Sequence, residues 1–206
     1  MRSIIQGNTN VVKGIAILIV AILITLFTVF LATGLSNRTS ATGRSGEQLI
    51  DKKSPDFLAV GIDGDPVSLS NYLGLPIVLN FWASWCPPCR DETPHFEKIW
   101  RLYRQKDVVV LGINVQDTLA DADEYIREFD VTFTNAIDKN GKIMVDYGVT
   151  GLPVTFFIDR DGIIIGRWVG SIGESSLQLR AEALENDSFR DIYGSDKNQD
   201  GFRKFN

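Results

Sequence analysis

The two residues most suited to chemistry are Cys86 and Cys89, the only cysteines of the chain, separated by two prolines. An apolar run at 77–79 precedes them and a helix-like segment at 91–104 follows. This order predicts a strand, a tight turn and the start of a helix. Unpaired N–H groups and the helix dipole at such a start favour a thiolate, the reactive form of cysteine. We therefore expect Cys86 to be an exposed nucleophile and Cys89 the thiol that resolves its mixed disulfides.

A structural disulfide and half of a zinc site are the competing interpretations of this pair. A small stapled scaffold needs several cysteines, whereas 206 residues suffice for a hydrophobic core. Zinc sites take four nitrogen or sulfur ligands, and His95 is the only histidine. We interpret His95 as a structural or exposed side chain. The C-x-x-C spacing thus favours redox chemistry, for which neither a metal nor an organic cofactor is needed.

Composition sets the broad class of the protein. A hydrophobic share of 44% with 23% charged residues is typical of a globular domain with appendages. The net charge is −5 and no cluster of lysines and arginines stands out, which disfavours a nucleic-acid partner.

The N-terminal part predicts a membrane anchor. After a short segment at 1–13, residues 14–35 contain no charge, and about 33 Å of helix at 1.5 Å per residue is enough to cross a bilayer core. A cleaved signal peptide is the alternative, but its apolar region is usually about 7–15 residues long. Basic residues flank both ends, so charge leaves the orientation open. Residues 36–53, rich in Ser, Thr, Gly and charge, predict a flexible linker.

Residues 54–185 alternate between strand-like and helix-like patterns, which predicts an α/β domain with a parallel strand pair and an antiparallel hairpin. The expected strands are 57–60, 67–69, 77–82, 108–115, 136–137 and the hairpin ending in 163–169; the expected helices are 91–104, 120–129, 143–147 and 175–184. The polar residues 186–206 predict a mobile tail. Within it, 196–201 match only the opening of a calcium-binding EF-hand loop.

WCPPC after a strand, Pro94 in the following helix, and the stretch GLPVT before the last hairpin together resemble the thioredoxin superfamily. More narrowly, SPDF, VSLSNYLGLPIVLNFWASWCPPCRDETP, INVQD and YGVTGLPVTFFIDRDG resemble its membrane-anchored TlpA/ResA/CcmG branch. The resemblance implies a thioredoxin-like fold: a central mixed sheet flanked by helices, with an N-terminal strand extension and a helix–strand insertion at 120–137. It also implies a thiol–disulfide oxidoreductase of the bacterial cell envelope.

The resemblance further implies which residues surround the cysteine pair. Pro153 is expected to be cis and to face the cysteines, leaving backbone groups of Leu152 free to pair with an extended substrate. Trp85, Pro87 and Pro88 are expected to border the same substrate site.

An acid next to the resolving thiol is the remaining element of the expected site. Asn80 stands where general thioredoxins carry a buried acid, and it cannot accept a proton. Glu92, three residues after Cys89, lies on the same face of the expected helix. The branch implies that such an acid takes the proton of the resolving thiol; the alternative is a solvated first-turn carboxylate.

The implied function is a reductant that works on the extracytoplasmic side of the cell membrane, anchored by one pass through the bilayer. Its implied partners are a protein disulfide, with apocytochrome c as one target, and a membrane-embedded thiol donor. The alternatives are a disulfide-forming oxidant and a tethered binding module without redox activity. A peroxiredoxin is disfavoured because Leu79 and Ala83 occupy positions where its signature before Cys86 requires Pro and Thr or Ser.

Overall fold

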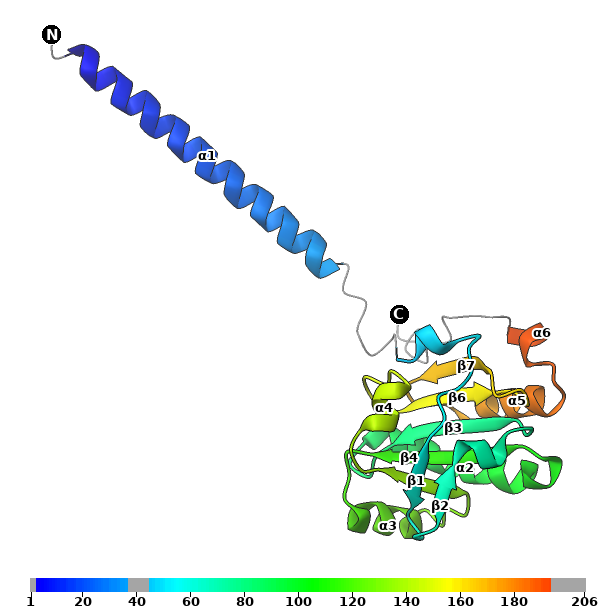
Figure 1. Cartoon of the computed structure of the whole chain (residues 1–206). Coiled ribbons are helices and arrows are strands. Elements are labelled where there is room, and N and C mark those ends of the chain that lie inside the picture. The colour runs from blue at the N-terminus through cyan, green and yellow to red at the C-terminus, as the bar shows by residue number, and fades with distance from the viewer. Residues whose placement is uncertain (1–2, 37–44, 194–206) are drawn as a thin grey trace. The chain divides into compact units, whose positions relative to one another are not determined.

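The computed structural model describes residues 3–36 and 45–193, which belong to two separate compact units. The first is a single helix, α1 (Ser3–Ser36), drawn in blue in Figure 1. Within the described residues it is the one helix long and apolar enough to cross a membrane, through 13–30. All side chains from 13 to 30 are exposed.

The second unit is built on one seven-stranded sheet (Figure 1). Its strands are β1 (Leu58–Gly61), β2 (Pro66–Ser68), β3 (Ile77–Trp82), β4 (Val109–Val115), β5 (Thr134–Asp138), β6 (Val154–Ile158) and β7 (Ile164–Val169). The helices are α2 (Pro87–Tyr103), α3 (Leu119–Glu128), α4 (Lys142–Asp146), α5 (Glu174–Glu185) and α6 (Phe189–Tyr193), with short 3₁₀ turns η2 (Glu47–Leu49), η3 (Leu69–Tyr72) and η4 (Arg104–Lys106).

The strand order is β2-β1-β5-β4-β3-β6-β7, with β3, β4 and β5 parallel and the other pairs antiparallel. The predicted mixed sheet is confirmed. β3 lies near its centre and is buried along its whole length because both of its faces are covered. Leu79 and Phe81 join the core cluster on the α4 side, whereas Val78 joins the cluster that α2 and α5 cover.

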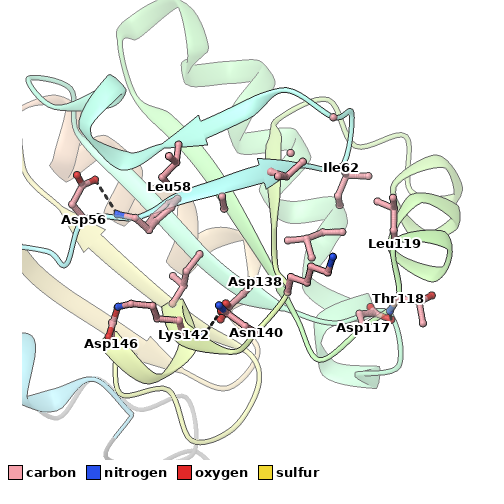
Figure 2. Close-up of a pocket in the computed structure, with 18 residues that line it drawn as sticks. Asp56, Leu58, Ile62, Asp117, Thr118, Leu119, Asp138, Asn140, Lys142 and Asp146 are labelled. Carbon is pink, nitrogen blue, oxygen red and sulfur yellow. Dashed lines mark hydrogen bonds and ion pairs between the residues drawn. The ribbon is translucent and has the colours of Figure 1, made fainter.

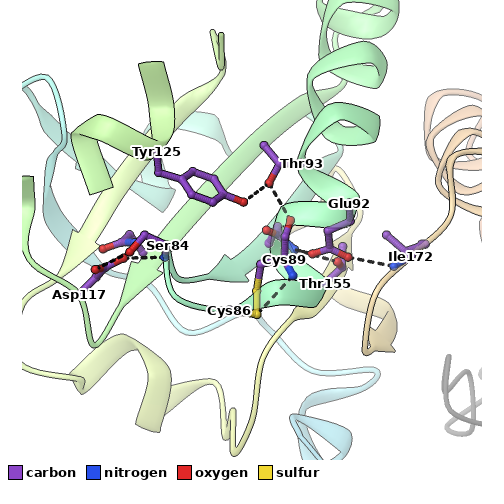
Figure 3. Close-up of a disulfide and its surroundings, with 11 residues drawn as sticks. Ser84, Cys86, Cys89, Glu92, Thr93, Asp117, Tyr125, Thr155 and Ile172 are labelled. Atoms are coloured by element: carbon purple, nitrogen blue, oxygen red, sulfur yellow. Dashed lines mark hydrogen bonds between the residues drawn. A yellow bond between two sulfur atoms is a disulfide. The ribbon is translucent and has the colours of Figure 1, made fainter. Parts of the chain in front are cut away.

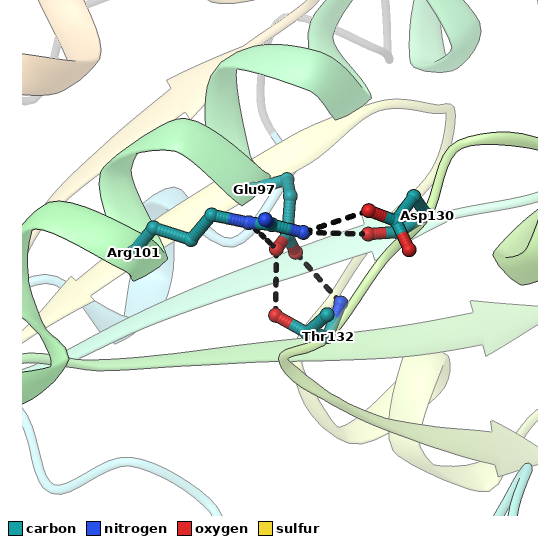
Figure 4. Close-up of polar contacts among 4 residues, drawn as sticks. All are labelled: Glu97, Arg101, Asp130 and Thr132. Atoms are coloured by element: carbon teal, nitrogen blue, oxygen red, sulfur yellow. Dashed lines mark hydrogen bonds and ion pairs between the residues drawn. The ribbon is translucent and has the colours of Figure 1, made fainter.

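The predicted insertion contributes α3 and β5. It is attached to α2 through Glu97, whose side chain is buried (Figure 4). Glu97 accepts hydrogen bonds from the Thr132 N–H at 2.7 Å, from the Thr132 hydroxyl at 2.6 Å and from Arg101 Nε at 2.5 Å. Arg101 in turn binds the Asp130 carboxylate at 2.9 Å. These bonds hold the loop before β5 against the helix that carries the cysteines.

The predicted linker and tail are each too long. Residues 45–53, assigned to the linker at 36–53, pack on the domain: Ile50 is buried in the core, and the Asp51 N–H donates to the Ile164 carbonyl at 2.8 Å. The tail at 186–206 contains α6, whose Phe189 is also buried. Single apolar residues in polar stretches have no period, so the sequence pattern missed both. Residues 37–44 and 194–206, including the calcium-loop match, lie outside the described part of the chain.

Candidate active site

Cys86 and Cys89 form a disulfide at the N-terminus of α2 (Figure 3). Cys86 is the residue that caps the helix, and the Cys89 N–H donates to its sulfur at 3.3 Å. Pro87 and Pro88 occupy the first helical positions, where a missing N–H breaks no helical bond. The predicted position of the pair is confirmed. A thiolate on Cys86 in the reduced protein gains the Cys89 N–H and the positive end of a 17-residue helix.

The prediction that Cys86 is exposed is wrong, since only 3% of the residue is accessible to solvent. Both cysteines belong to an apolar cluster that includes Trp82 and Tyr125. The residues beside the pair are exposed instead: Trp85 is 55% exposed, and Pro87 and Pro88 also face solvent. These three residues thus form an exposed apolar rim beside the buried disulfide, and their contact with a substrate stays a prediction.

The Leu152–Pro153 peptide bond is cis, as predicted. Leu152 is half-buried and packs against the cluster that contains both cysteines. Pro153 is buried, and its carbonyl accepts a hydrogen bond from the Gly170 N–H at 2.9 Å. The structure thus brings this loop, far away in the sequence, to the cysteine pair.

Glu92 is buried on the side of α2 that carries Cys89 (Figure 3). Asn80 of β3 donates an amide hydrogen to Glu92 Oε1, and the Ile172 N–H donates to Oε2, both at 2.9 Å. Burial raises the pKa of Glu92 to about 8, because desolvation of the carboxylate outweighs the two hydrogen bonds that favour it. This is close to the ordinary thiol pKa of about 8.5. That Glu92 takes the proton of Cys89 stays a prediction at this point.

The sequence singled out Glu92 and Asn80 but not their bond, nor the backbone donor at Ile172. Asn80 also donates to the Thr155 hydroxyl at 3.2 Å. Asn80, the lone polar residue in an otherwise apolar strand, was the sequence signal for its bonds, because a buried amide needs hydrogen-bond partners. His95, interpreted as structural or exposed, is half-buried with Nδ1 3.2 Å from the Ile172 carbonyl.

Asp117, which the sequence did not single out, fixes the loop before the cysteines. Its carboxylate accepts hydrogen bonds from the Ser84 N–H at 2.7 Å, the Ser84 hydroxyl at 2.9 Å and the Asn114 amide at 3.0 Å. Next to it, the Trp85 indole donates to the Gln116 carbonyl at 2.9 Å. The end of β4 thus positions the residues that lead into Cys86.

The insertion also reaches the site, through Tyr125 of α3. The Thr93 hydroxyl donates to the Cys89 carbonyl at 2.9 Å, so the Tyr125 hydroxyl is left to donate to Thr93 (Figure 3). The Tyr125 ring stacks on Trp82 with centroids 4.5 Å apart. Burial raises the pKa of Tyr125 to about 12, which keeps this donor protonated.

A disulfide that caps a helix, a buried acid beside its second cysteine and a cis-proline loop, all on a mixed sheet, define a thioredoxin-like thiol–disulfide oxidoreductase of the TlpA/ResA type. Comparison with known proteins agrees with this class. Residues 50–167 match the AhpC/TSA family, and the chain belongs to that family.

Of three similar proteins, two carry a disulfide oxidoreductase activity in their names. The chain is 33% identical over 129 residues to the thiol-disulfide oxidoreductase ResA of Bacillus thuringiensis, which covers 63% of this chain and 75% of the relative. A secreted disulfide oxidoreductase of Mycobacterium tuberculosis, homologous to DsbE of E. coli, is similar in structure, with a TM-score of 0.59, 27% identity and coverage of 62% and 96%. StoA of Bacillus subtilis is similar with a TM-score of 0.54, 27% identity and coverage of 61% and 96%.

Proposed function

We propose that this thiol–disulfide oxidoreductase is tethered to the cell membrane by α1 and reduces protein disulfides on the extracytoplasmic side. The observation that carries the proposal is the pairing of a helix-capping disulfide with a buried acid whose pKa is about 8. The apolar stretch of α1, which has no charged residue over 14–35, supports the tether, and the relative named thiol-disulfide oxidoreductase ResA supports the thiol–disulfide chemistry.

In the reductive direction the Cys86 thiolate attacks one sulfur of the substrate disulfide. The substrate's other sulfur leaves as a thiolate, and a mixed disulfide remains. Cys89 then gives its proton to the Glu92 carboxylate and attacks Cys86. The Cys86–Cys89 bond forms and the first substrate sulfur leaves as a thiolate. Two electrons pass from the enzyme to the substrate, and Glu92 ends protonated.

The return step needs a dithiol donor, which we assign to a membrane-embedded thiol carrier. Its thiolate attacks Cys86, Cys89 leaves as a thiolate, and protonated Glu92 supplies the proton that Cys89 takes up. A second donor thiol then loses its proton to water, attacks the first donor sulfur and closes the donor's own disulfide, and Cys86 leaves as a thiolate. A carboxyl group with a pKa of about 8 suits both halves of this cycle, because it accepts the proton in one half and returns it in the other.

In this proposal the substrate contacts come from exposed Trp85, Pro87 and Pro88 next to the disulfide and from the loop of Leu152 and Pro153. Apocytochrome c, whose haem-binding cysteines must be reduced before attachment, is the target that the resemblance to this branch supports. The cysteine pair itself carries the electrons, so the proposed reaction uses no metal and no organic cofactor.

Trapping of mixed disulfides tests the order of the two thiols. In cells, full-length chain with Cys89→Ser should accumulate disulfide-linked substrate, whereas Cys86→Ser should accumulate none. Function that survives Cys86→Ser would instead identify a redox-inactive binding module.

The midpoint potential of the full chain tests the direction of transfer. A value below about −200 mV supports the reductant, because glutaredoxins and thioredoxin have potentials in that range, whereas a value near −120 mV matches a strong oxidant.

Protease protection tests the topology. Protease added to spheroplasts, whose cell membrane is still sealed, should digest the domain. A protected domain contradicts the proposed orientation.

A further inference from the structure

A large cavity of about 770 Å³ lies beside the redox site, between β1, the start of α3 and α4 (Figure 2). Its apolar lining includes Leu58, Val60, Ile62 and Leu119, which come from β1, the turn after it and α3. None of these residues has a role in the proposed electron transfer. We call this cavity and its extension toward Trp85 the distal groove.

The groove is continuous with the rim of the disulfide. A second hollow of about 550 Å³ is lined by Trp85, the residue next to Cys86, and by Gln116. The two hollows share five lining residues, which are Asp117, Thr118, Asp138, Lys139 and Asn140. A polypeptide whose disulfide lies at Cys86 can therefore continue past Trp85 into the larger cavity without leaving the surface.

The apolar side chains of the groove are exposed to an extent that indicates binding. Leu58 is 77%, Val60 60% and Leu119 56% exposed, and all three line the same cavity. Scattered exposed leucines are ordinary on protein surfaces, but a contiguous apolar lining inside a concavity is typical of a binding site. Covering it removes apolar surface from water, which is favourable.

The charged residues that line the groove favour a ligand of one charge over the other. Four aspartates line the larger cavity, Asp56, Asp117, Asp138 and Asp146, against two lysines, Lys139 and Lys142. Lys142 already forms an ion pair with Asp146. The remaining excess is negative, so the groove attracts a basic segment and repels an acidic one.

From these observations we propose that the distal groove binds the polypeptide flanking the substrate's disulfide, and that it prefers a segment with apolar side chains and at least one lysine or arginine. The inference rests on the proposed function and adds the substrate class. The groove contributes affinity for protein substrates, whereas a small disulfide needs only the cysteine pair and its rim.

The test compares rates of reduction for substrates that do and do not reach the groove. The enzyme is the reduced full-length chain in detergent micelles. The probes are a small aryl disulfide with a coloured thiolate and two peptides with the same disulfide, one flanked by leucine and lysine, the other by leucine and glutamate. The groove variant is Leu58→Ser with Leu119→Ser. Its matched control is Leu102→Ser with Leu179→Ser, two leucines 49% and 57% exposed that lie outside the groove.

We expect the groove variant to lower kcat/KM for the leucine–lysine peptide about tenfold, as loss of central apolar contacts does in other interfaces. Its rate with the aryl disulfide and the control's rates with every probe should stay within about twofold. The wild-type chain should prefer the lysine peptide over the glutamate peptide, and Asp56→Asn should reduce this preference.

Equal rates of the wild type and the groove variant with the peptides overturn the inference, as does a preference for the glutamate peptide. A change of the monomer–dimer equilibrium by the groove variant, measured by sedimentation, would show that a second copy of the chain occupies the groove instead. A wild-type chain that reduces neither the peptides nor the aryl disulfide defeats the proposed function itself, a result distinct from a peptide-specific failure.

Discussion

Glu92 couples the redox site to the stability of the domain, because its pKa is about 8 when folded and 4.5 when unperturbed. Between these values the unfolded chain loses a proton that the folded chain keeps. The free energy of unfolding must therefore fall as pH rises from about 4.5 to about 8, and this contribution levels off above that range. We predict that Glu92→Gln removes this slope, as measured by urea unfolding of the oxidised protein across the range.

The slope, rather than the stability at one pH, is the informative quantity for this variant. A glutamine presents one oxygen to the two donors of Asn80 and Ile172, so some stability is lost at every pH. Exposed Glu182 supplies the matched control: Glu182→Gln should leave the slope unchanged. An unchanged slope in Glu92→Gln would refute the assignment of the raised pKa to this group.

His95 positions the donor that binds Glu92. With a hydrogen on Nδ1 it donates to the Ile172 carbonyl, and the N–H of the same residue donates to Glu92 Oε2. We predict that His95→Leu loosens this loop and raises the pKa of Glu92 further, which moves the midpoint of the Cys89 resolving step to higher pH. Stopped-flow rates of mixed-disulfide resolution against pH measure the midpoint.

His95→Asn, which keeps a short side-chain donor, is the rescue variant for this prediction. It should restore the midpoint at least in part. If leucine and asparagine shift the midpoint equally, or neither shifts it, His95 has no influence on Glu92.

At the scale of elements, Asp117 joins the end of β4 to the loop between β3 and α2. Its carboxylate satisfies the N–H and hydroxyl of Ser84 and the amide of Asn114. Asp117→Ala leaves these donors without their partner, so we predict a loss of roughly 1–3 kcal/mol in the free energy of unfolding. Chemical denaturation measures it, with exposed Asp161→Ala as the control. Equal stability of the two variants would contradict the role of Asp117.

The helices and strands were predictable from the sequence where their apolar residues follow a regular pattern. The expected strand at 77–82 matches β3 because all six residues are buried and all but Asn80 are apolar. The expected helix at 120–129 matches α3 within one residue, since Tyr125 and its neighbours repeat with the helical period. β5 was predicted at only two of its five residues, because Thr134, Asn135 and Asp138 interrupt its apolar pattern.

Contacts between distant elements were beyond the sequence. The type and spacing of Cys86 and Cys89 identified the chemistry, and the resemblance added Glu92; all three residues lie at the N-terminal end of α2. The bonds of Glu92 to Ile172 and of Ser84 to Asp117 depend on strand order and loop geometry, which no local pattern encodes. The burial of Cys86 was missed for the same reason, since Leu152 and α3 reach the cysteine cluster only in the folded chain.

At the scale of the whole molecule, the segment 45–53 decides where the catalytic unit begins. The Lys52 carbonyl accepts from the Ile164 N–H at 2.9 Å and the Asp51 N–H donates to the Ile164 carbonyl, so the segment extends the pairing of β7. Ile50 fills part of the core, and the Asp51 carboxylate pairs with Arg190 at 2.7 Å. The segment is therefore part of the domain rather than of its tether.

We predict that a soluble fragment starting at Ser45 is more stable than one starting at Ser54 by at least about 2–4 kcal/mol, because removal of a buried isoleucine alone has a cost of that order. Urea unfolding of the two oxidised fragments measures the difference. Ile50→Ala in the longer fragment separates the core contribution from that of the backbone pairing, and it should account for a large part of the loss. Fragments of equal stability would mean that 45–53 lies on the domain without supporting it, and that the tether begins where the sequence pattern placed it.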